Sequence, residues 1–531
     1  MKSNKQIQFH TLDAKPAVNV CIFRNRKYID FKIEDNVFDV MDLENNTVLA
    51  GISSDRVWRI KIKESKPAVY SYFLILDEST DMDSIRKNYE AFQKTVSNIT
   101  IIDTGGDVYL GERFLTTNKK YLLLAGPFED ERTARHNSKL FGQLNHCRLH
   151  RQQVKDGSGV LEIFDSEYEI SAEVKDGIRL VPHDHSAMIE LEHFEIHNHN
   201  NDKRQHEQLF YPGEMTIKID ESELLAGMSS VCVEDYLKGV IHSEIGAGEP
   251  FEFVKSMAIV ARSEVFARFG QKHIGELFDF CGDGHCLRYF GKRFNDPVID
   301  RAVKETRGQV LGDNGRVCDA HFTYSCGGHT ENAADVWLTS TSNFSIGKYD
   351  GNSNKKNEVD LTREEEGQKW ILRRPDVYCN LVSNEPPAAL KDATETFRWE
   401  VFYTRNELEQ ILEEKTGEQP GIIYEIIPKK RGVSGRLKEV EIFGSLKNIT
   451  IKGELNIRSA FSDGLLKSSC FFVKPDVDDD GVPINFMFIG AGMGHGVGLC
   501  KVGAAMMAKD NKSADEILLH YFEKSKIIKI Y

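Results

Sequence analysis

The spacing of hydrophobic and polar residues changes period several times along the chain. Apolar and polar residues alternate between about residues 17 and 64, which predicts short β-strands. The same alternation returns from residue 147 to residue 230, for example over 159–164 and 215–219. We therefore predict a β module in residues 1–68 that continues in residues 147–230.

Residues 69–146 follow a different pattern. Strand-like segments at 70–76, 99–102, 108–114 and 120–128 alternate with helical spacing over 81–96 and 130–144, so a βαββαβ domain is expected. After residue 230 longer helical periods begin, with helices predicted at 233–245 and 251–269. A charged, irregular stretch at about 350–392 is predicted to be a surface insertion within a domain of residues 231–531. The fold class is α+β.

Composition narrows the choice of partners. The chain of 531 residues is long enough for two to four domains. Its formal net charge of -14 argues against a nucleic-acid partner, because phosphate contacts need a basic surface. No apolar run is long enough to form a transmembrane segment, and the first residues lack the apolar core of a secretory signal. The 10 cysteines are not spaced as a disulfide scaffold, and pairing among Cys318, Cys326 and Cys379 stays open.

Glu244 is the candidate general acid. Tyr236, Val240 and Glu244 fall at i, i+4 and i+8 of the first predicted helix, so the acid continues an apolar stripe. Burial disfavours the charged carboxylate and raises its pKa, and a carboxyl group that stays protonated can donate a proton. Alternatively, Glu244 lies at the edge of the stripe and only caps the helix or pairs with a cation.

Two cations follow on the next helix. Lys255 and Arg262 are seven residues apart and therefore share one helix face. Together they could hold an anionic ligand beside Glu244. A solvated helix face is the alternative.

Two thiols and two imidazoles lie close together after this helix. His273, Cys281, His285 and Cys286 are a donor set suited to tetrahedral zinc, and Gly282 and Gly284 allow a tight turn between ligands. Four protein ligands would fill the coordination sphere, so the site is expected to be structural. The alternatives are a Cys281–Cys286 disulfide and a His273 that merely ends a helix.

Two glycine-containing segments complete the candidate chemistry. A strand followed by Gly327-Gly328 is expected to line a sugar site with hydroxyl and acidic side chains, which are Tyr324, Ser325, Thr330 and Glu331. Cys326 is a weaker candidate for a nucleophile or for a disulfide with Cys318. The alternating glycines around His495 lack the phosphate-loop and dinucleotide patterns, so no nucleotide cofactor is expected. A close-packed turn that directs His495 at a neighbouring site is predicted instead.

Six of these segments, taken in order, resemble the SpoIID/LytB family of bacterial cell-wall proteins. They are residues 233–244, 255–262, 281–289, 306–310, 327–331 and 490–500. Residues 69–146, with Gly126-Pro127-Phe128 before a helix, resemble a SPOR domain, a small peptidoglycan-binding fold. The expected architecture is a SpoIID-type catalytic domain with an N-terminal β module and an inserted SPOR-like domain.

The resemblance implies a lytic transglycosylase that acts on peptidoglycan glycan strands lacking stem peptides. Glu244 would protonate the glycosidic oxygen between N-acetylmuramic acid and N-acetylglucosamine. As a base it would then help the C6 hydroxyl to form a 1,6-anhydro product. Lys255 and Arg262 would contact substrate, and zinc would bind the His/Cys set, although His273 lies farther from Cys281 than expected.

The resemblance also leaves alternatives. Some relatives enhance a cell-wall amidase without cutting glycan, and a zinc hydrolase would need an open metal position. The family implies an extracytoplasmic location, for which this sequence shows no export signal. Cys326 stands where many relatives have a small hydroxyl residue. A SPOR-like domain fits either role, because a second glycan-binding module raises the effective concentration on the polymer.

Overall fold

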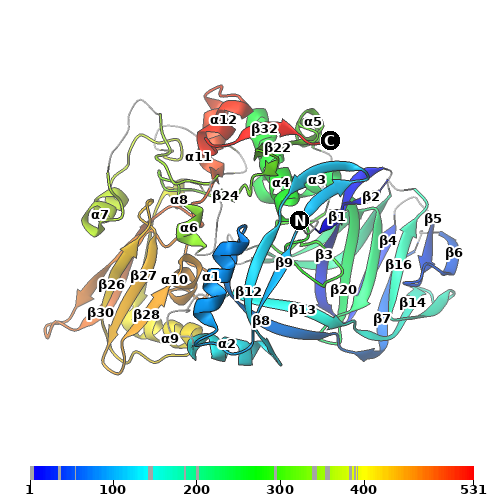
Figure 1. Ribbon diagram of the computed structural model, residues 1–531, viewed down its shortest axis with the longest axis horizontal. Helices are drawn as coiled ribbons and strands as arrows, with labels where there is room; N and C mark the ends of the chain where they lie inside the picture. Colours follow the sequence, from blue (N-terminus) through cyan, green and yellow to red (C-terminus); the bar gives the residue numbers. More distant parts are fainter. Residues whose placement is uncertain are drawn as a thin grey trace.

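The computed structural model describes most of the chain. The described residues are 5–12, 14–33, 37–53, 56–140, 148–184, 187–198, 203–291, 296–337, 344–352, 359–381, 386–387, 390 and 393–531. They form a mixed, strand-rich α+β structure (Figure 1). No helix in these ranges is long and apolar enough to cross a bilayer.

The β module consists of two sheets built from both predicted halves. One sheet has the order β15-β14-β7-β4-β17-β18, and the other has the order β2-β3-β20-β19-β16-β5-β6, with β21 paired to β3. Each sheet combines strands from residues 1–68 with strands from residues 158–232, and inward residues such as Phe31 and Trp58 belong to one core. The strands are β2 (His10–Leu12), β3 (Lys15–Arg26), β4 (Tyr28–Ile33), β5 (Val37–Met41), β6 (Thr47–Ser53), β7 (Trp58–Lys66), β14 (Ser158–Asp165), β15 (Ser171–Lys175), β16 (Gly177–Pro182), β17 (Met188–Asn198), β18 (Lys203–Pro212), β19 (Glu214–Ile219), β20 (Leu225–Cys232) and β21 (Phe280–Cys281).

The unit inserted into this module has the predicted βαββαβ order. Its four-stranded antiparallel sheet runs β13-β8-β12-β9, and two further strands, β10 and β11, pair with β1. The elements are β1 (Gln6–Gln8), β8 (Val69–Ser79), α1 (Met82–Phe92), β9 (Ile99–Thr104), β10 (Asp107–Leu110), β11 (Arg113–Thr117), β12 (Lys120–Phe128), α2 (Glu131–Leu140) and β13 (Arg148–Lys155). The predicted end at residue 146 is too early, because β13 pairs along β8. The likeness to a SPOR domain stays a prediction.

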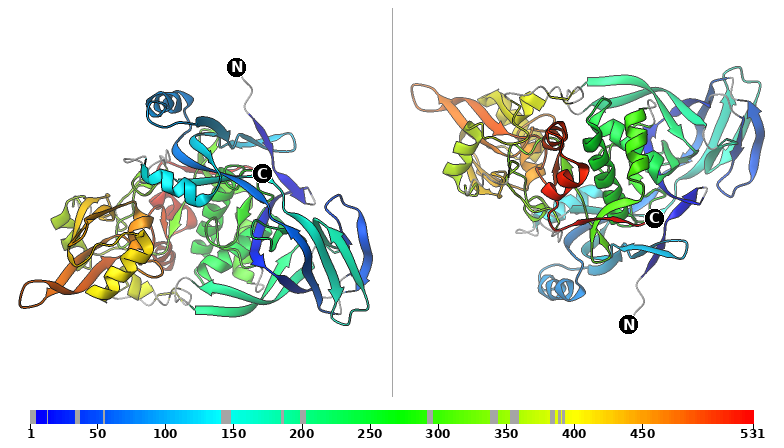
Figure 2. Two further views of the ribbon diagram at one scale, coloured as in Figure 1. Left: turned by 90° about the horizontal axis from the view of Figure 1, so that it is seen from below. Right: turned by 90° about the horizontal axis from the view of Figure 1, so that it is seen from above.

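The site is built on two helices that pack against the β module. Almost every residue of α4 from Phe253 to Ala267 is buried, and α3, α5, α11 and α12 surround it. Figure 2 shows the C-terminal helices (red) beside these green helices from two sides. The elements are α3 (Val233–Ile245), α4 (Phe251–Arg268), α5 (Pro297–Glu305), β22 (Gln309–Asp313), β23 (Arg316–Val317), β24 (Phe322–Thr323), α6 (Ala333–Val336), β31 (Leu499–Cys500), α11 (Lys501–Lys509), α12 (Ala514–Tyr521) and β32 (Lys526–Lys529).

A second packed unit interrupts this region. Trp399, Leu437, Phe471 and Phe488 belong to a hydrophobic cluster separate from the main core. Its elements are β25 (Arg398–Thr404), α9 (Arg405–Thr416), β26 (Ile423–Arg431), β27 (Leu437–Gly444), β28 (Ile449–Lys452), α10 (Glu454–Ala460), β29 (Phe471–Val477) and β30 (Pro483–Ala491), at the left of Figure 1. The predicted insertion at 350–392 covers only the approach to this unit, and it contains α7 (Glu364–Leu372) and precedes α8 (Thr394–Phe397). Separate packing of residues 398–491 was not foreseen.

Candidate functional site

Glu244 lies at the C-terminal end of α3, almost enclosed by protein. Its side chain is 9% exposed, and Lys501, at the start of α11, donates to Glu244 Oε2 at 3.0 Å and to its backbone carbonyl at 2.8 Å. The backbone N–H of Arg288 donates to Glu244 Oε1 at 3.3 Å. Within the part of the chain that the structure describes, the hydrogen bonds and the ion pair of this side chain are with Arg288 and Lys501. The carboxylate therefore sits between one cation and one backbone donor.

These partners correct one expectation about Glu244. Burial raises its pKa, but the nearby charges of Lys501 and Arg288 and the hydrogen bonds from both residues lower it by more. The net pKa lies below the ordinary value of a glutamate, so Glu244 is ionised in the free protein. The expectation that burial would keep it protonated does not hold for the free protein, whereas the alternative that Glu244 pairs with a cation does.

The four predicted His and Cys side chains converge. One donor atom from each of His273, Cys281, His285 and Cys286 lies within 4.8 Å of the others. Cys281 Sγ is 3.5 Å from His285 Nδ1, and Cys286 Sγ is 3.4 Å from His273 Nε2 and 3.8 Å from His285 Nδ1. Sulfur and nitrogen ligands of one tetrahedral zinc ion are about 3.6 Å apart. The donor set and its spacing fit such an ion, and both cysteines are free thiols, so no disulfide joins them.

The local backbone explains the tight spacing of this cluster. Gly284 has φ +98°, which L-residues with a side chain rarely adopt, so the turn before His285 depends on glycine. His273 also has a positive φ of 50° and follows α4 by a few residues. The chain reverses between His273 and Cys286, so the two side chains meet. His273 was the least expected ligand because it is far from Cys281 in the sequence.

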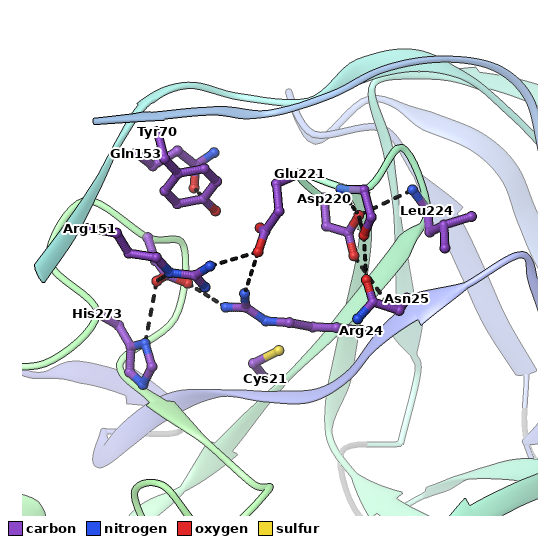
Figure 3. Close-up of polar contacts among 12 residues, drawn as sticks. Cys21, Arg24, Asn25, Tyr70, Arg151, Gln153, Asp220, Glu221, Leu224 and His273 are labelled. Carbon is purple, nitrogen blue, oxygen red and sulfur yellow. Dashed lines mark hydrogen bonds and ion pairs between the residues drawn. The ribbon is translucent and has the colours of Figure 1, made fainter. Parts of the chain in front are cut away.

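A buried carboxylate supports His273 from outside the cluster. Glu276 Oε1 lies 3.5 Å from His273 Nδ1. Figure 3 shows Arg24, Arg151 and His273 converging from three elements, and the group that they share is the Glu276 carboxylate. A carboxylate on the outer nitrogen of a histidine fixes its orientation and favours metal binding by the other nitrogen. Arg151 belongs to β13, so the inserted βαββαβ unit takes part in this support.

The His/Cys cluster is connected to Glu244 through a short stretch of chain. Arg288, which donates to Glu244, lies two residues after Cys286 and forms a β-bridge with Asp283 inside the turn. The next residues continue along α3, where Phe290 N donates to Ser243 Oγ at 3.1 Å. A fixed turn at 281–286 therefore fixes the donor on Glu244.

The glycine-rich turn around His495 is closely packed, as predicted, and its glycines leave room for neighbouring groups. A side chain at Gly496 would overlap the guanidinium of Arg436, and one at Gly498 would overlap the carbonyl of His321. The turn places the His495 ring 5.0 Å from the ring of the half-buried Trp337 and 6.3 Å from that of His321. Burial lowers the pKa of His321 to about 3 and that of His495 well below its usual value, so both imidazoles are neutral.

Four of the predicted substrate contacts have buried side chains, and their role stays a prediction. Arg262 is 0% exposed and bonds Glu234 at 2.6 and 3.1 Å. Glu331 accepts from Ser434 Oγ at 2.6 Å and from backbone N–H groups. The remaining two side chains are equally enclosed, and they are Ser325 and Thr330.

Two other predicted residues are accessible. Lys255 is partly exposed and pairs with Glu252 at 3.2 Å on its own helix. Tyr324 lies beside the site, since the Lys501 ammonium is 5.5 Å from its ring and 5.5 Å from the ring of Phe322. The structure thus brings Glu244 and Tyr324 together around a residue that was not singled out.

Lys501 and Trp337 are the residues that sequence reasoning missed. Lys501 is 4% exposed and heads a helix whose next seven residues are uncharged and mostly apolar. A lone lysine at the start of such a buried helix was the available signal. Trp337 follows the four-residue helix α6 and carries no comparable pattern in the sequence.

Comparisons with known proteins agree with this geometry. Residues 222–312 match the family model described as stage II sporulation protein (SpoIID), and residues 331–498 match a domain of unknown function, DUF8618. Both the Glu244 helix and the His/Cys turn lie in the first match. The second match spans the separately packed unit and the segment that leads into it.

Three curated proteins are similar at low identity. An uncharacterized protein of Brachyspira hyodysenteriae is 27% identical over 60% of this chain and 72% of its own length. The stage II sporulation protein D of Bacillus subtilis is 23% identical over 56% of this chain and 75% of its own length. The amidase enhancer of Bacillus subtilis is 23% identical over 54% of this chain. The matched region covers only 39% of the length of that protein.

The fold and the site define an α+β protein with one enclosed carboxylate. The match of residues 222–312 and the similar proteins support a SpoIID-type domain and a cell-wall-related role.

Proposed function

We propose that this protein is a lytic transglycosylase that cleaves the bond between N-acetylmuramic acid and N-acetylglucosamine in glycan strands without stem peptides. The observation that carries the proposal is the enclosed Glu244 carboxylate, with Lys501 and a backbone N–H as partners. A hydrolase would use a second carboxylate as nucleophile or water-activating base. A transglycosylase needs one acid, because the substrate supplies its own nucleophile.

The lowered pKa of Glu244 assigns a role to Lys501. Glycan without stem peptides carries free lactyl carboxylates. A lactyl carboxylate that pairs with the Lys501 ammonium would draw its charge away from Glu244. Burial, which favours the neutral acid, would then dominate and raise the pKa of Glu244, so the carboxylate would take up a proton from solvent when the substrate binds. This coupling favours strands without stem peptides over substituted strands.

In the chemical step, Glu244 gives up one proton and receives another, so it ends protonated as it began. Glu244 gives its proton to the glycosidic oxygen as the bond from that oxygen to C1 breaks. The C6 hydroxyl of the same muramic residue attacks C1 and gives its proton to the Glu244 carboxylate. The products are a shortened strand and a 1,6-anhydro end, without consumption of water.

Neighbouring side chains suit a sugar polymer. Trp337, flanked by His321 and His495, offers an aromatic ring with neutral polar partners. Tyr324 directly follows the strand that carries Phe322, and its ring lies 5.5 Å from the Lys501 ammonium. We assign both rings to sugar positions next to the cleaved bond.

Zinc in the His/Cys cluster would be structural. His273, Cys281, His285 and Cys286 would fill its four positions and leave none for water. The ion would fix the turn that presents Arg288 N–H to Glu244. The βαββαβ unit would act as a SPOR-like glycan-binding module, and the working site would be extracytoplasmic.

A second candidate function is amidase enhancement without cleavage. The Glu244–Lys501 pair also ties the end of α3 to the start of α11, as a structural ion pair would. In this role the protein would bind glycan and a cell-wall amidase, as the name of the Bacillus subtilis relative suggests.

Digestion of purified glycan strands distinguishes the transglycosylase from the amidase enhancer. The full chain and Glu244→Gln are incubated with strands that carry or lack stem peptides, and Glu252→Gln serves as the control carboxylate. We expect anhydro products from bare strands with the native chain and the control, and none with Glu244→Gln, which still binds. Intact strands in every reaction, with stimulation of an added amidase, would favour the enhancer.

A further inference from the structure

Four buried side chains from distant parts of the chain form a second cluster of metal-ligand type. One donor atom from each of Cys326, Asp350, Cys379 and Cys500 lies within 4.8 Å of the others. All four residues are at most 2% exposed. Three thiols and a carboxylate are a known kind of donor set for zinc, with a Zn–S distance of about 2.3 Å.

The distances suit a shared ion better than a disulfide. Cys326 Sγ lies 3.6 Å from Cys379 Sγ and 3.0 Å from Asp350 Oδ2. Two thiolates on one tetrahedral zinc are about 3.8 Å apart, whereas a disulfide bond is about 2.05 Å long. The cysteines of the cluster are free thiols in this structure.

The carboxylate of the cluster is oriented from outside. Asp350 Oδ1 accepts from Tyr521 Oη at 2.8 Å and lies 3.2 Å from His520 Nε2. Both partners are on α12, and they leave Asp350 Oδ2 directed at Cys326. Metal ligands are commonly held by such outer hydrogen bonds, which fix the ligand before the ion arrives.

The sulfur atoms receive backbone donors as thiolates do. Gly328 N–H lies 3.3 Å from Cys326 Sγ, and Gly503 N–H lies 3.4 Å from Cys500 Sγ. The N–H of Cys326 itself points at Cys500 Sγ at 3.3 Å. Three backbone N–H groups therefore lie within hydrogen-bond distance of the Cys326 and Cys500 sulfur atoms.

The cluster lies where the separately packed unit meets the SpoIID part of the fold. Cys326 and Cys500 lie on the turn and strand next to α11, whereas Asp350 and Cys379 belong to the segment that leads into residues 398–491. Backbone bonds from Asp350 N to Gly328 O and from Tyr378 N to Asp350 O hold these loops together. Cys500 directly precedes Lys501, the partner of Glu244.

We propose that Cys326, Asp350, Cys379 and Cys500 form a second structural metal site, with zinc as its ion. The ion crosslinks the entry and exit of the inserted unit and anchors the residue next to Lys501. Binding releases the thiol protons to solvent, so the protein supplies thiolate ligands. Buried cysteines that merely fill space are the competing account, and Cys318 and Cys470 provide examples outside either cluster.

Metal content of the full chain tests the site. The chain is produced with excess zinc, freed of loosely bound metal and measured by elemental mass spectrometry. We expect two ions in the native chain, one in Cys326→Ser/Cys379→Ser, one in Cys281→Ser/Cys286→Ser, and two in the control Cys318→Ser/Cys470→Ser. One ion in the native chain and none in Cys281→Ser/Cys286→Ser would overturn the second site while leaving the first intact.

Cobalt binding to the native chain provides a second measurement of the number of metal sites. Metal-free native chain is titrated with Co(II), and thiolate-to-cobalt absorption is followed in the near ultraviolet. The proposal predicts that absorption grows through two equivalents, and that Cys281→Ser/Cys286→Ser retains the signal of a site with three thiolates. Saturation at one equivalent, or a Cys326–Cys379 disulfide found by non-reducing peptide mapping, would contradict it.

Discussion

Lys501 sets the electrostatics of the site through a single side chain. Its ammonium contacts both the carboxylate and the backbone carbonyl of Glu244. The charge of Lys501 is the largest of the influences that lower the pKa of Glu244, and burial opposes it. The same residue therefore stabilises the resting site and, by our proposal, responds to the anionic substrate.

Replacing Lys501 with Met is predicted to change the pH dependence of cleavage. Glu244 must be protonated to act as an acid, so kcat/KM falls as the pH rises through its pKa. Without the lysine charge, burial dominates and this pKa rises, so the alkaline limb of the kcat/KM profile moves to higher pH. Lys512→Met, on the exposed loop after α11, is the control and leaves the limb in place. An unchanged or lower limb in Lys501→Met would refute the coupling.

Arg262 and Lys255 offer a matched pair on one helix. Arg262 is fully buried against Glu234, whereas Lys255 is partly exposed. Arg262→Met removes a fully buried guanidinium from Glu234, which is 18% exposed and keeps a hydrogen bond from Tyr531 Oη, so we expect a loss of about 3 kcal/mol in the free energy of unfolding. Lys255→Met should change it by less than about 0.5 kcal/mol. Denaturant unfolding measures both, and equal effects would show that Arg262 is not a core residue.

At the scale of elements, the His/Cys turn and α3 act together. The turn carries Arg288, and its neighbour Phe290 donates to Ser243 on α3. Glu276 ties His273 to two arginines, one of them in the inserted βαββαβ unit. The segment that contains Glu276 and the His/Cys turn therefore contacts three parts of the fold, which are α3, β3 and the inserted βαββαβ unit.

Metal removal is predicted to loosen this segment. A ligand that binds only the folded state stabilises it by roughly 4 kcal/mol when its concentration is a thousand times its Kd. Chelation should therefore lower Tm, and added zinc should restore it. His285→Ala removes an exposed donor and should lessen the zinc-dependent gain, whereas His183→Ala, at a distant ion pair, should not. A Tm that is indifferent to zinc would contradict the metal assignment.

Local periodicity was sufficient to predict several elements and insufficient for the contacts between them. The helices predicted at 233–245 and 251–269 are confirmed because each is a local run rich in hydrophobic residues. The βαββαβ order holds for the elements of the four-stranded sheet, with β10 and β11 added between β9 and β12. Lys501 is 257 residues from Glu244, and no pattern within either helix encodes that contact. The spacing of the His/Cys set was visible because its members are near in sequence, whereas Cys326, Asp350, Cys379 and Cys500 meet only through the tertiary fold.

At the scale of the whole molecule, the chain contains cores that pack separately. The main core joins the β module to the helices around α4, and another core forms inside residues 398–491. The second contains aromatic residues such as Phe471 and Phe488. The three cysteines of the metal-type cluster belong to the main core.

Large-to-small substitutions should show whether the two cores unfold separately. Phe488→Ala, in the inserted unit, and Phe266→Ala, in the main core, each remove a fully buried ring and should cost about 3–5 kcal/mol. Because the cores are distinct, differential scanning calorimetry should show each variant lowering a different part of the unfolding profile. One shared, equally shifted transition would show that the two cores unfold as a single cooperative unit.

The most direct test of the account is to carry out cleavage in heavy-oxygen water. Bare glycan strands are incubated with the full chain, and the new ends are weighed by mass spectrometry, with Glu244→Gln as the inactive control. We predict new muramic ends that lack one water molecule and carry no heavy oxygen, because the C6 hydroxyl of the substrate is the nucleophile. Heavy oxygen in the new ends would show hydrolysis, and cleavage that survives in Glu244→Gln would remove Glu244 from the centre of the mechanism.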